Sequence, residues 1–189
     1  MFAGHFGVAA AARGKVPEVP LWALVISVQL LDIVFVPLLL LGVESIEPIN
    51  GGGYGRNVIH APYTHSLAGA VLISVAVALV AWRRWGRRGG FALGTLTLSH
   101  WLLDLIVHRG DMAVMFGPSG QVRLGLGLWE NAFASATLEA SVITAGFLMY
   151  RRFILTNLPR NRRNWGLAAT AAMAVCLILA LVTDVLGIS

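Results

Sequence analysis

The sequence predicts an all-α polytopic membrane protein with five transmembrane helices and an N-terminal half-helix, folded as one integral membrane domain over residues 1–189. Composition is the first reason, because 57% of the residues are hydrophobic and 12% are charged, whereas soluble domains average about 25% charged residues. The mean hydropathy of +0.76 agrees with this prediction. The single cysteine, Cys176, lies in an apolar run and excludes an internal disulfide bond.

Five apolar runs are each long enough to cross a bilayer as a helix, which takes roughly 17–25 residues. These runs are residues 22–43, 66–82, 89–108, 132–150 and 164–186. An additional apolar run, residues 2–12, is too short to span and is followed by Arg13 and Lys15. We therefore expect this run to enter the membrane as a half-helix whose basic end lies at the surface.

Positive charge predicts the orientation. The loops after the second and fourth runs hold nine of the fourteen Lys and Arg residues, and loops of this kind stay on the cytoplasmic side. We expect the N-terminus to be cytoplasmic too, the C-terminus to lie outside, and the protein to reside in the inner (cytoplasmic) membrane of a bacterium. The net charge of +5 is gathered in short loops, which favours contact with the lipid bilayer and its anionic headgroups over a nucleic-acid partner.

The strongest functional signal is the stretch from Ser99 to Asp111. His100, Asp104 and His108 are spaced four residues apart, so on a helix they project from nearly one face. An Asp at the centre of a membrane helix costs about 2.5–3.5 kcal/mol, which argues for a function of this stripe rather than simple packing. Imidazole and carboxylate groups on one face are typical of transition-metal sites.

Other ionisable groups in the apolar runs fall at a similar depth. With a rise of 1.5 Å per residue from the basic side, His5 lies about 12 Å deep, Asp32 about 15–18 Å and His100 about 16 Å. The predicted metal ligands are His5, Asp32, His65, His100, Asp104 and His108. This set suits Zn²⁺ first, with Mn²⁺ or Fe²⁺ as alternatives, and suits Cu⁺ poorly. Taken singly, each of these residues could instead pack between helices; their convergence favours the metal site.

Three further residues are candidates for catalysis. Glu139, midway along the fourth run, and His60, in the loop before the second run, could act as general base or acid. The alternatives are a hydrogen bond between helices for Glu139 and an ordinary loop position for His60. Arg109 lies at the outer lip, where a guanidinium could hold an anionic group of a substrate or form a surface ion pair with Asp111.

Short motifs carry a resemblance to a known family. They are Gly4-His5, Leu31-Asp32, His60-x-x-x-Thr64-His65-Ser66, Ser99-His100-x-x-x-Asp104 and Leu124-Gly125-Leu126-Gly127-Leu128-Trp129. At these positions the chain resembles the inner-membrane metal-dependent hydrolases that are described as LexA-binding. It is also similar to a group of short bacterial membrane proteins labelled permeases. Val34 and Phe35 stand where the hydrolase family has a second Asp and a His, and Ala61-Pro62 replaces an Arg-Gly pair.

The order of the motif residues is also distantly similar to that in zinc-dependent phospholipase C and the related single-strand nucleases, which are all-helical phosphoesterases. That resemblance implies one zinc ion surrounded by Asp32, His65, His100 and Asp104. It also implies that His5 helps to hold a second ion and that His108 with Glu139 holds a third.

The function that we expect is metal-dependent hydrolysis of a phosphoester in or near lipid, at a site facing the outer side of the membrane. Two alternatives stay open. A metal-ion or proton-coupled permease would use the same ligands but needs access from both faces, and the predicted inner half has almost no polar lining. A non-catalytic membrane scaffold would need no metal.

Overall fold

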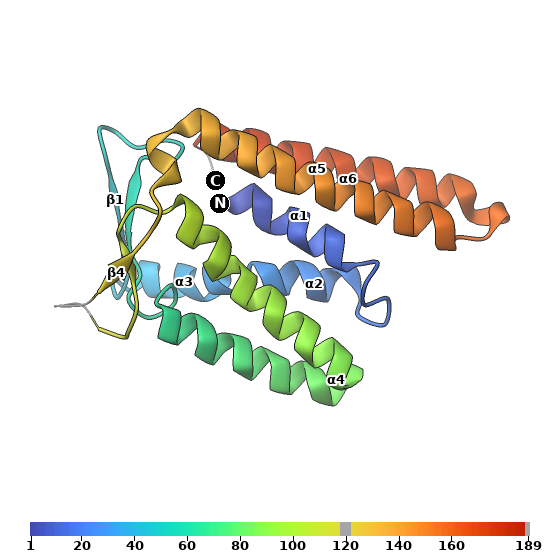
Figure 1. Ribbon diagram of the computed structural model, residues 1–189, viewed down its shortest axis with the longest axis horizontal. Coiled ribbons are helices and arrows are strands. Elements are labelled where there is room, and N and C mark those ends of the chain that lie inside the picture. Colours follow the sequence, from blue (N-terminus) through green and yellow to red (C-terminus); the bar gives the residue numbers. More distant parts are fainter. Residues whose placement is uncertain (118–121, 188–189) are drawn as a thin grey trace.

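The computed structural model describes residues 1–117 and 122–187 and is mostly helical (Figure 1). Its helices are α1 (Phe2–Ala12), α2 (Leu21–Val28), α3 (Leu30–Leu40), α4 (Leu67–Val107), α5 (Ala132–Asn157) and α6 (Arg163–Val185). Two short 3₁₀ helices, η1 (Leu128–Glu130) and η2 (Arg160–Arg162), precede α5 and α6. The helical class is confirmed, although the structure also contains four short strands.

The strands form two antiparallel ribbons at one end of the helix bundle (Figure 1). β1 (Ser45–Pro48) pairs with β2 (Asn57–His60), and β3 (Met112–Ala113) pairs with β4 (Arg123–Leu124). The turn between β1 and β2 contains a glycine cluster, Gly51, Gly52, Gly53 and Gly55, whose φ angles are all positive, which glycine adopts without steric cost. From the sequence, this glycine cluster indicates a flexible connector between the first and second apolar runs; in the structure the stretch forms a β-hairpin.

Helix α4 is itself a helical hairpin. Its backbone leaves the helical conformation at Trp85 and at Gly86, where φ is +69°. The two legs lie side by side, since a Cβ atom placed on Gly94 in the second leg would lie 2.7 Å from the Cβ atom of Ala78 in the first. The basic loop that the sequence predicts after the second apolar run is thus a tight turn at Trp85 and Gly86.

Within residues 1–117 and 122–187, three helical segments are long and apolar enough to cross a membrane: α4, α5, and η2 together with α6. Helices α2 and α3 pass the same test as a pair, although they meet at an angle of 51°. The structure therefore gives three candidate spans, or four if the bent pair is one span. In this total the two legs of α4 are counted together as one helix. The predicted number of five is not confirmed by this count.

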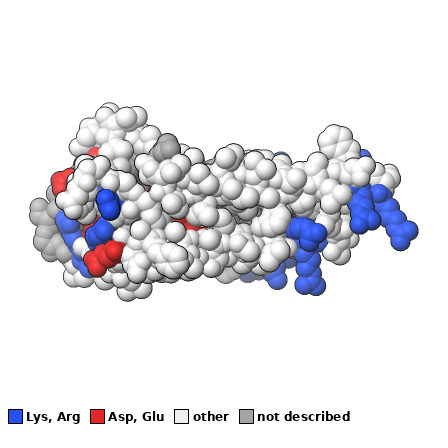
Figure 2. Space-filling model, turned by 90° about the horizontal axis from the view of Figure 1, so that it is seen from above, with Lys and Arg blue, Asp and Glu red and all other residues white. Residues whose placement is uncertain are grey.

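Charge divides the molecule into two unlike ends. Figure 2 shows Lys and Arg gathered at one end, which we call the basic end, while the opposite end carries both signs. The α1–α2 turn lies at the basic end with the turn of α4, because Arg88 pairs with Glu18 at 3.7 Å and donates to the carbonyl group of Lys15. The predicted half-helix α1 points its C-terminal end there. Met1, however, is buried within the bundle rather than lying at that surface.

The apolar core lies on both sides of a polar layer. On the side of the basic end, α1, α2 and α4 enclose a buried cluster that we call the basal core: Ala9, Val16, Val19, Ala23, Leu24, Val28, Ala81, Leu93 and Leu96. Toward the strands, a smaller cluster contains Leu31, Ala70, Trp101 and Met112. Buried His and Asp side chains occupy the layer between these clusters.

Two glycines set the position of α1. A Cβ atom on Gly7 would lie 2.8 Å from the Cα atom of Ile143, and one on Gly146 would lie 2.0 Å from the carbonyl oxygen of Gly7. The backbones of α1 and α5 therefore touch at this crossing. Because α1 also packs on α2, α4 and α6, this contact fixes the helix that carries His5.

Gly146→Ala is expected to lower the apparent melting temperature of the detergent-solubilised protein by roughly 4–10 °C, because the added methyl group overpacks the α1–α5 crossing. Alanine otherwise favours a helix over glycine by about 1 kcal/mol, so helix propensity alone predicts the opposite sign. Gly110→Ala is the control, since a Cβ atom there meets nothing within 4 Å. Equal melting temperatures for both variants would contradict the close contact.

Candidate metal centre

The break between α2 and α3 positions the first two groups of the site, which are the carboxylate of Asp32 and the carbonyl of Val28. Gln29, with φ of −103° and ψ of 5°, separates α2 from α3. Asp32 lies in the first turn of α3, where the helix dipole stabilises a carboxylate. The carbonyl oxygen of Val28, the last residue of α2, lies 2.6 Å from Nδ1 of His100. The break therefore presents one carboxylate and one backbone acceptor to α4.

His65 is positioned by the start of α4. Ser66 caps this helix, and its hydroxyl oxygen accepts a hydrogen bond from the amide of Gly69 at 3.0 Å. Trp101, on the second leg of α4, donates its indole N–H to the carbonyl oxygen of His65 at 2.9 Å. These contacts hold His65 beside the leg that carries His100 and Asp104.

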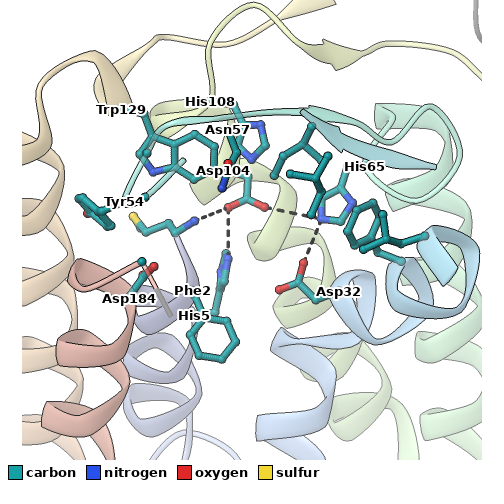
Figure 3. Close-up of a pocket in the computed structure, with 18 of the residues that line it drawn as sticks. Phe2, His5, Asp32, Tyr54, Asn57, His65, Asp104, His108, Trp129 and Asp184 are labelled. Carbon is teal, nitrogen blue, oxygen red and sulfur yellow. Dashed lines mark hydrogen bonds and ion pairs between the residues drawn. The ribbon is translucent and has the colours of Figure 1, made fainter. Parts of the chain in front are cut away.

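Five of the predicted metal ligands meet in one cluster. Asp104 is its centre: Oδ1 lies 3.2 Å from Nε2 of His5, and Oδ2 lies 3.0 Å from Nε2 of His100. Oδ1 of Asp32 lies 3.3 Å from Nε2 of His65 and 3.5 Å from Nε2 of His100. Figure 3 shows Asp104 between His5 and His65, with Asp32 below His65. Segments that are far apart in the sequence therefore converge as the depth estimate predicts.

Two groups of three residues have ligand atoms within 4.8 Å of one another. One is His5, His100 and Asp104, and the other is Asp32, His65 and His100. The rings of His5 and His100 stack with their centroids 3.8 Å apart. Oδ1 of Asp104 also accepts from the amino group of Met1 at 3.1 Å, so its other oxygen, Oδ2, is the one that faces His65 and His100.

Hydrogen bonds from outside the cluster assign the ring protons. A backbone carbonyl only accepts, so Nδ1 of His100 must donate to Val28. Thr64 Oγ1 lies 2.7 Å from Oε2 of Glu44 and 2.9 Å from Nδ1 of His65. Because the single hydroxyl proton of Thr64 goes to the Glu44 carboxylate, its oxygen accepts from Nδ1–H of His65.

Glu44 is held in place for this role. The residue is buried, and its Oε1 accepts from the amides of Tyr63 and Thr64, both at 2.9 Å. A carboxylate that fixes the orientation of a ligating imidazole, directly or through a hydroxyl, is a common outer layer of metal sites.

With Nδ1 protonated on both rings, the neutral rings of His65 and His100 turn their Nε2 lone pairs toward carboxylate oxygens. Lone pairs at 3.0–3.5 Å repel unless a positive charge lies between them. That charge is either a second proton on each ring or a metal cation. Two imidazole nitrogens and two carboxylate groups form a donor set that fits a borderline divalent ion such as Zn²⁺.

A cavity of about 320 Å³ adjoins the cluster. Asp32, His65 and Asp104 contribute to its wall, with Phe2 and His5 from α1. The β1–β2 hairpin covers it with Ile46, Tyr54, Gly55, Asn57 and Ile59. The cluster is therefore accessible to a small group bound in the cavity.

The β1–β2 hairpin, residues 45–60, forms the roof of the cavity and is held in place by hydrogen bonds to its neighbours. The guanidinium of Arg109 donates to the carbonyl oxygens of Gly55 and Trp129. The Tyr54 hydroxyl donates to Oγ of Ser135 at 2.9 Å, and burial raises the pKa of the Tyr54 phenol above its usual value. The amide of Ile59 donates to Oδ2 of Asp111 at 3.0 Å. The roof thus contacts α5, η1 and the segment after α4.

His108 does not join the five-residue cluster, although it lines the same cavity. Its Nδ1 lies 3.0 Å from Oδ1 of Asp111, and its ring lies against Trp129 with centroids 4.3 Å apart. Figure 3 shows it above Asp104, on the side of the roof. One member of the predicted ligand set is therefore an Asp-anchored histidine at the cavity wall.

Among the residues that the structure describes, none of the three predicted catalytic residues lines this cavity. His60 lies 3.3 Å from Glu47 and borders a separate hollow. Arg109 donates to one carbonyl group of the roof and to one of η1, and it does not line the cavity. Glu139 reaches the right depth but is fully buried, with Asp184 and Asp104 among its charged neighbours. We therefore assign none of the three to direct chemistry.

Three residues of this site have no functional role in the sequence-based prediction. Glu44 follows an apolar run directly, and an acidic residue at that point is a weak signal in retrospect. Asp111 is buried against His108 rather than paired with Arg109 at the surface. Asp184 lines the cavity and accepts from the amide of Ala3 at 3.3 Å. No local pattern indicates these pairings.

The fold and the cluster define a class: a polytopic helical membrane protein with buried His and Asp residues beside a roofed cavity. The model of the YdjM inner membrane protein family matches residues 1–186, and the chain belongs to that family. The family confirms the inner-membrane part of the resemblance. Neither the curated proteins nor the solved structures gave a match.

Thr64→Val is expected to weaken zinc binding by about 10–100-fold, because it removes the acceptor that orients His65 and leaves the buried Nδ1–H without a partner. Zinc affinity of the purified protein, measured by competition with a fluorescent chelator, checks this. Thr144→Val on the exposed face of α5 is the control. An unchanged affinity in Thr64→Val would contradict the role given to the hydroxyl.

Proposed function

We propose that the protein is a membrane-embedded metal-dependent hydrolase that acts on a phosphoester in or near lipid. One observation carries the proposal: His65 and His100 each have Nδ1 committed to an outside acceptor, and each turns Nε2 toward the carboxylates of Asp32 and Asp104. Such an arrangement is what a metal centre requires. The distant similarity of the motif order to zinc phosphoesterases supports the choice of phosphoester hydrolysis.

The residues that would hold the metal are Asp32, His65, His100 and Asp104, with His5 stacked against His100 as the fifth candidate. A bound divalent ion, zinc before manganese or iron, would supply an activated water with a pKa near about 7 and would polarise a phosphoryl oxygen. Glu44 and Thr64 orient His65, and the Val28 carbonyl orients His100. The chain thereby holds its ligands in one geometry.

His108 is the residue that we assign to proton transfer. Asp111 accepts from its Nδ1 and fixes the ring, so Nε2 is the atom available to the cavity that His108 lines. A histidine oriented by a carboxylate is a common general base or acid. This assignment replaces the roles that the sequence suggests for Glu139 and His60.

The structure favours a hydrolase over a permease. The basal core, which includes Leu24, Val28 and Leu96, separates the cluster from the basic end. Hydrolysis needs access from one side only, whereas transport needs a path past this apolar layer. The cavity with a roof on the strand side and an apolar floor on the other fits a reaction chamber.

Metal analysis and turnover test the proposal. Purified protein should contain stoichiometric metal after growth with zinc, and His100→Ala and Asp104→Ala should each lose most of it, while the control Asp184→Asn retains it. His108→Gln should keep the metal and lose at least about 100-fold in phosphodiester turnover. A wild-type protein without metal would contradict the proposed metal centre. If the protein binds metal, does not hydrolyse phosphodiesters, and carries metal ions into vesicles in a way that depends on the ligand residues, the permease is supported instead.

We also propose that five segments cross the membrane. They are the α2–α3 pair, the first leg of α4, the second leg of α4, α5 and α6. The basic end would lie in the cytoplasm and the ribbon end outside. In a Cys176→Ala background, Glu47→Cys should react with an impermeant maleimide added to intact spheroplasts, and Asn161→Cys should react only after lysis. The reverse pattern would invert the orientation.

A further inference from the structure

We infer that the ligand of the cavity is an amphiphile from the leaflet on the ribbon side, whose alkyl chain lies in an apolar groove between α1, α2 and α6. This inference rests on the proposed function, since the headgroup would be the phosphoester that occupies the cavity. It adds a second site, for the chain, and it makes the substrate a membrane lipid rather than a water-soluble phosphoester.

The groove has a volume of about 660 Å³ and is lined almost entirely by apolar side chains. Small residues four positions apart on α6, Ala172, Cys176 and Ala180, form one wall. Phe6 of α1 and Val25 of α2 form the facing walls. Because residues four apart lie on one helical face, the small side chains make a continuous channel along α6 instead of isolated gaps.

The groove and the polar cavity share one lining residue, Phe2. From Phe2 the groove follows α1 through Phe6 to Ala10, toward the basic end. Along α6 its lining extends from Ala180 to Ala169, which corresponds to about 16 Å of helix, roughly half of a 30 Å hydrocarbon core. This length suits the chain of a lipid from a single leaflet.

The direction of the groove selects the leaflet. A lipid whose headgroup faces the ribbon end points its chains toward the basic end, as the groove does from the cavity. A lipid of the opposite leaflet would present its headgroup at the basic end, where the basal core of Val16, Val19 and Leu24 is closed. Only the first orientation brings a headgroup to Asp32 and His65 while the chain fills the groove.

The route into the cavity is sideways. The roof is held by Arg109, Tyr54 and Asp111, as described above. By contrast, the lining residue Val36 on α3 is 51% exposed, and the Asp32 side chain is 36% exposed. Both belong to a helix of the membrane-spanning pair. A ligand dissolved in the bilayer therefore reaches the cluster without displacing the roof.

Ala172→Phe tests the groove, because a phenyl ring there would fill it. Ala171→Phe is the matched control, since Ala171 is the exposed neighbour on the same helix and does not line the groove. The first probe is phosphatidylglycerol, and native mass spectrometry counts the molecules retained per protein. Wild type and Ala171→Phe should retain one phosphatidylglycerol, and Ala172→Phe should retain none.

The second probe is a pair of phosphodiesters, 4-nitrophenyl dodecyl phosphate and 4-nitrophenyl methyl phosphate. Wild type should hydrolyse the dodecyl ester with a kcat/KM at least about 100-fold higher than that for the methyl ester. Ala172→Phe should lower the value for the dodecyl ester to that for the methyl ester and leave the methyl ester unchanged. Cys176→Phe, with Val175→Phe as its control, provides a second groove-filling variant if Ala172→Phe fails to fold.

The outcomes separate the two proposals. If wild type hydrolyses both esters with equal kcat/KM, and Ala172→Phe and Ala171→Phe give the same values as each other, the lipid groove is overturned and the hydrolase proposal stands. If wild type retains phosphatidylglycerol and Ala172→Phe does not, but neither ester is hydrolysed, the hydrolase proposal is overturned and the groove remains a lipid site. A wild-type dimer that Ala172→Phe converts to a monomer would assign the groove to a second copy and overturn the inference.

Discussion

The carboxylate of Asp104 is buried inside the helix bundle with the partly exposed carboxylate of Asp32 beside it, and the rest of the structure meets the requirement that this imposes. A buried carboxylate needs hydrogen-bond donors or positive charge around it, since its desolvation is costly. Here the partners are His5 of α1, His65 just ahead of the N-cap of α4, and His100 on the second leg of α4. The close glycine crossing of α1 on α5, the break at Gln29 and the capped start of α4 all serve to bring those partners within reach.

The same requirement explains why the outer layer of the site is built from main-chain carbonyls and a buried acid. Val28 offers its carbonyl because α2 ends there. Glu44 lies where the chain leaves α3, and its Oε1 accepts two amides of the segment before α4. The irregular backbone around the membrane-embedded cluster therefore supplies acceptors instead of leaving polar groups without partners.

The depth of the functional residues could be predicted from the sequence, but their direction around each helix could not. Counting residues from the basic ends placed His5, Asp32 and His100 at similar depths, and the structure brings these three together with His65 and Asp104. Glu139 has the correct depth, yet it interacts with Asp184 and does not itself line the cavity. Helical rise along an axis is regular, whereas rotation depends on packing that no local pattern contains.

Loop residues were harder still to predict, because their partners are distant in sequence. Arg109 looked suited to an anion, but its donors are used by carbonyls in the hairpin and in η1. The stretch that contains Glu44 and the glycine cluster gave only the signal of a flexible connector, although it forms a strand pair. These contacts are decided by tertiary structure.

The lateral entry that we propose for the cavity changes which quantity sets its occupancy by ligand. For a site that opens to water, occupancy follows the number of ligand molecules per volume. For a site that a ligand enters from the bilayer past the exposed, cavity-lining Val36, occupancy would follow the mole fraction of the ligand among the lipids of one leaflet. Added inert lipid would then act as a diluent, and the composition of the membrane itself would regulate the reaction.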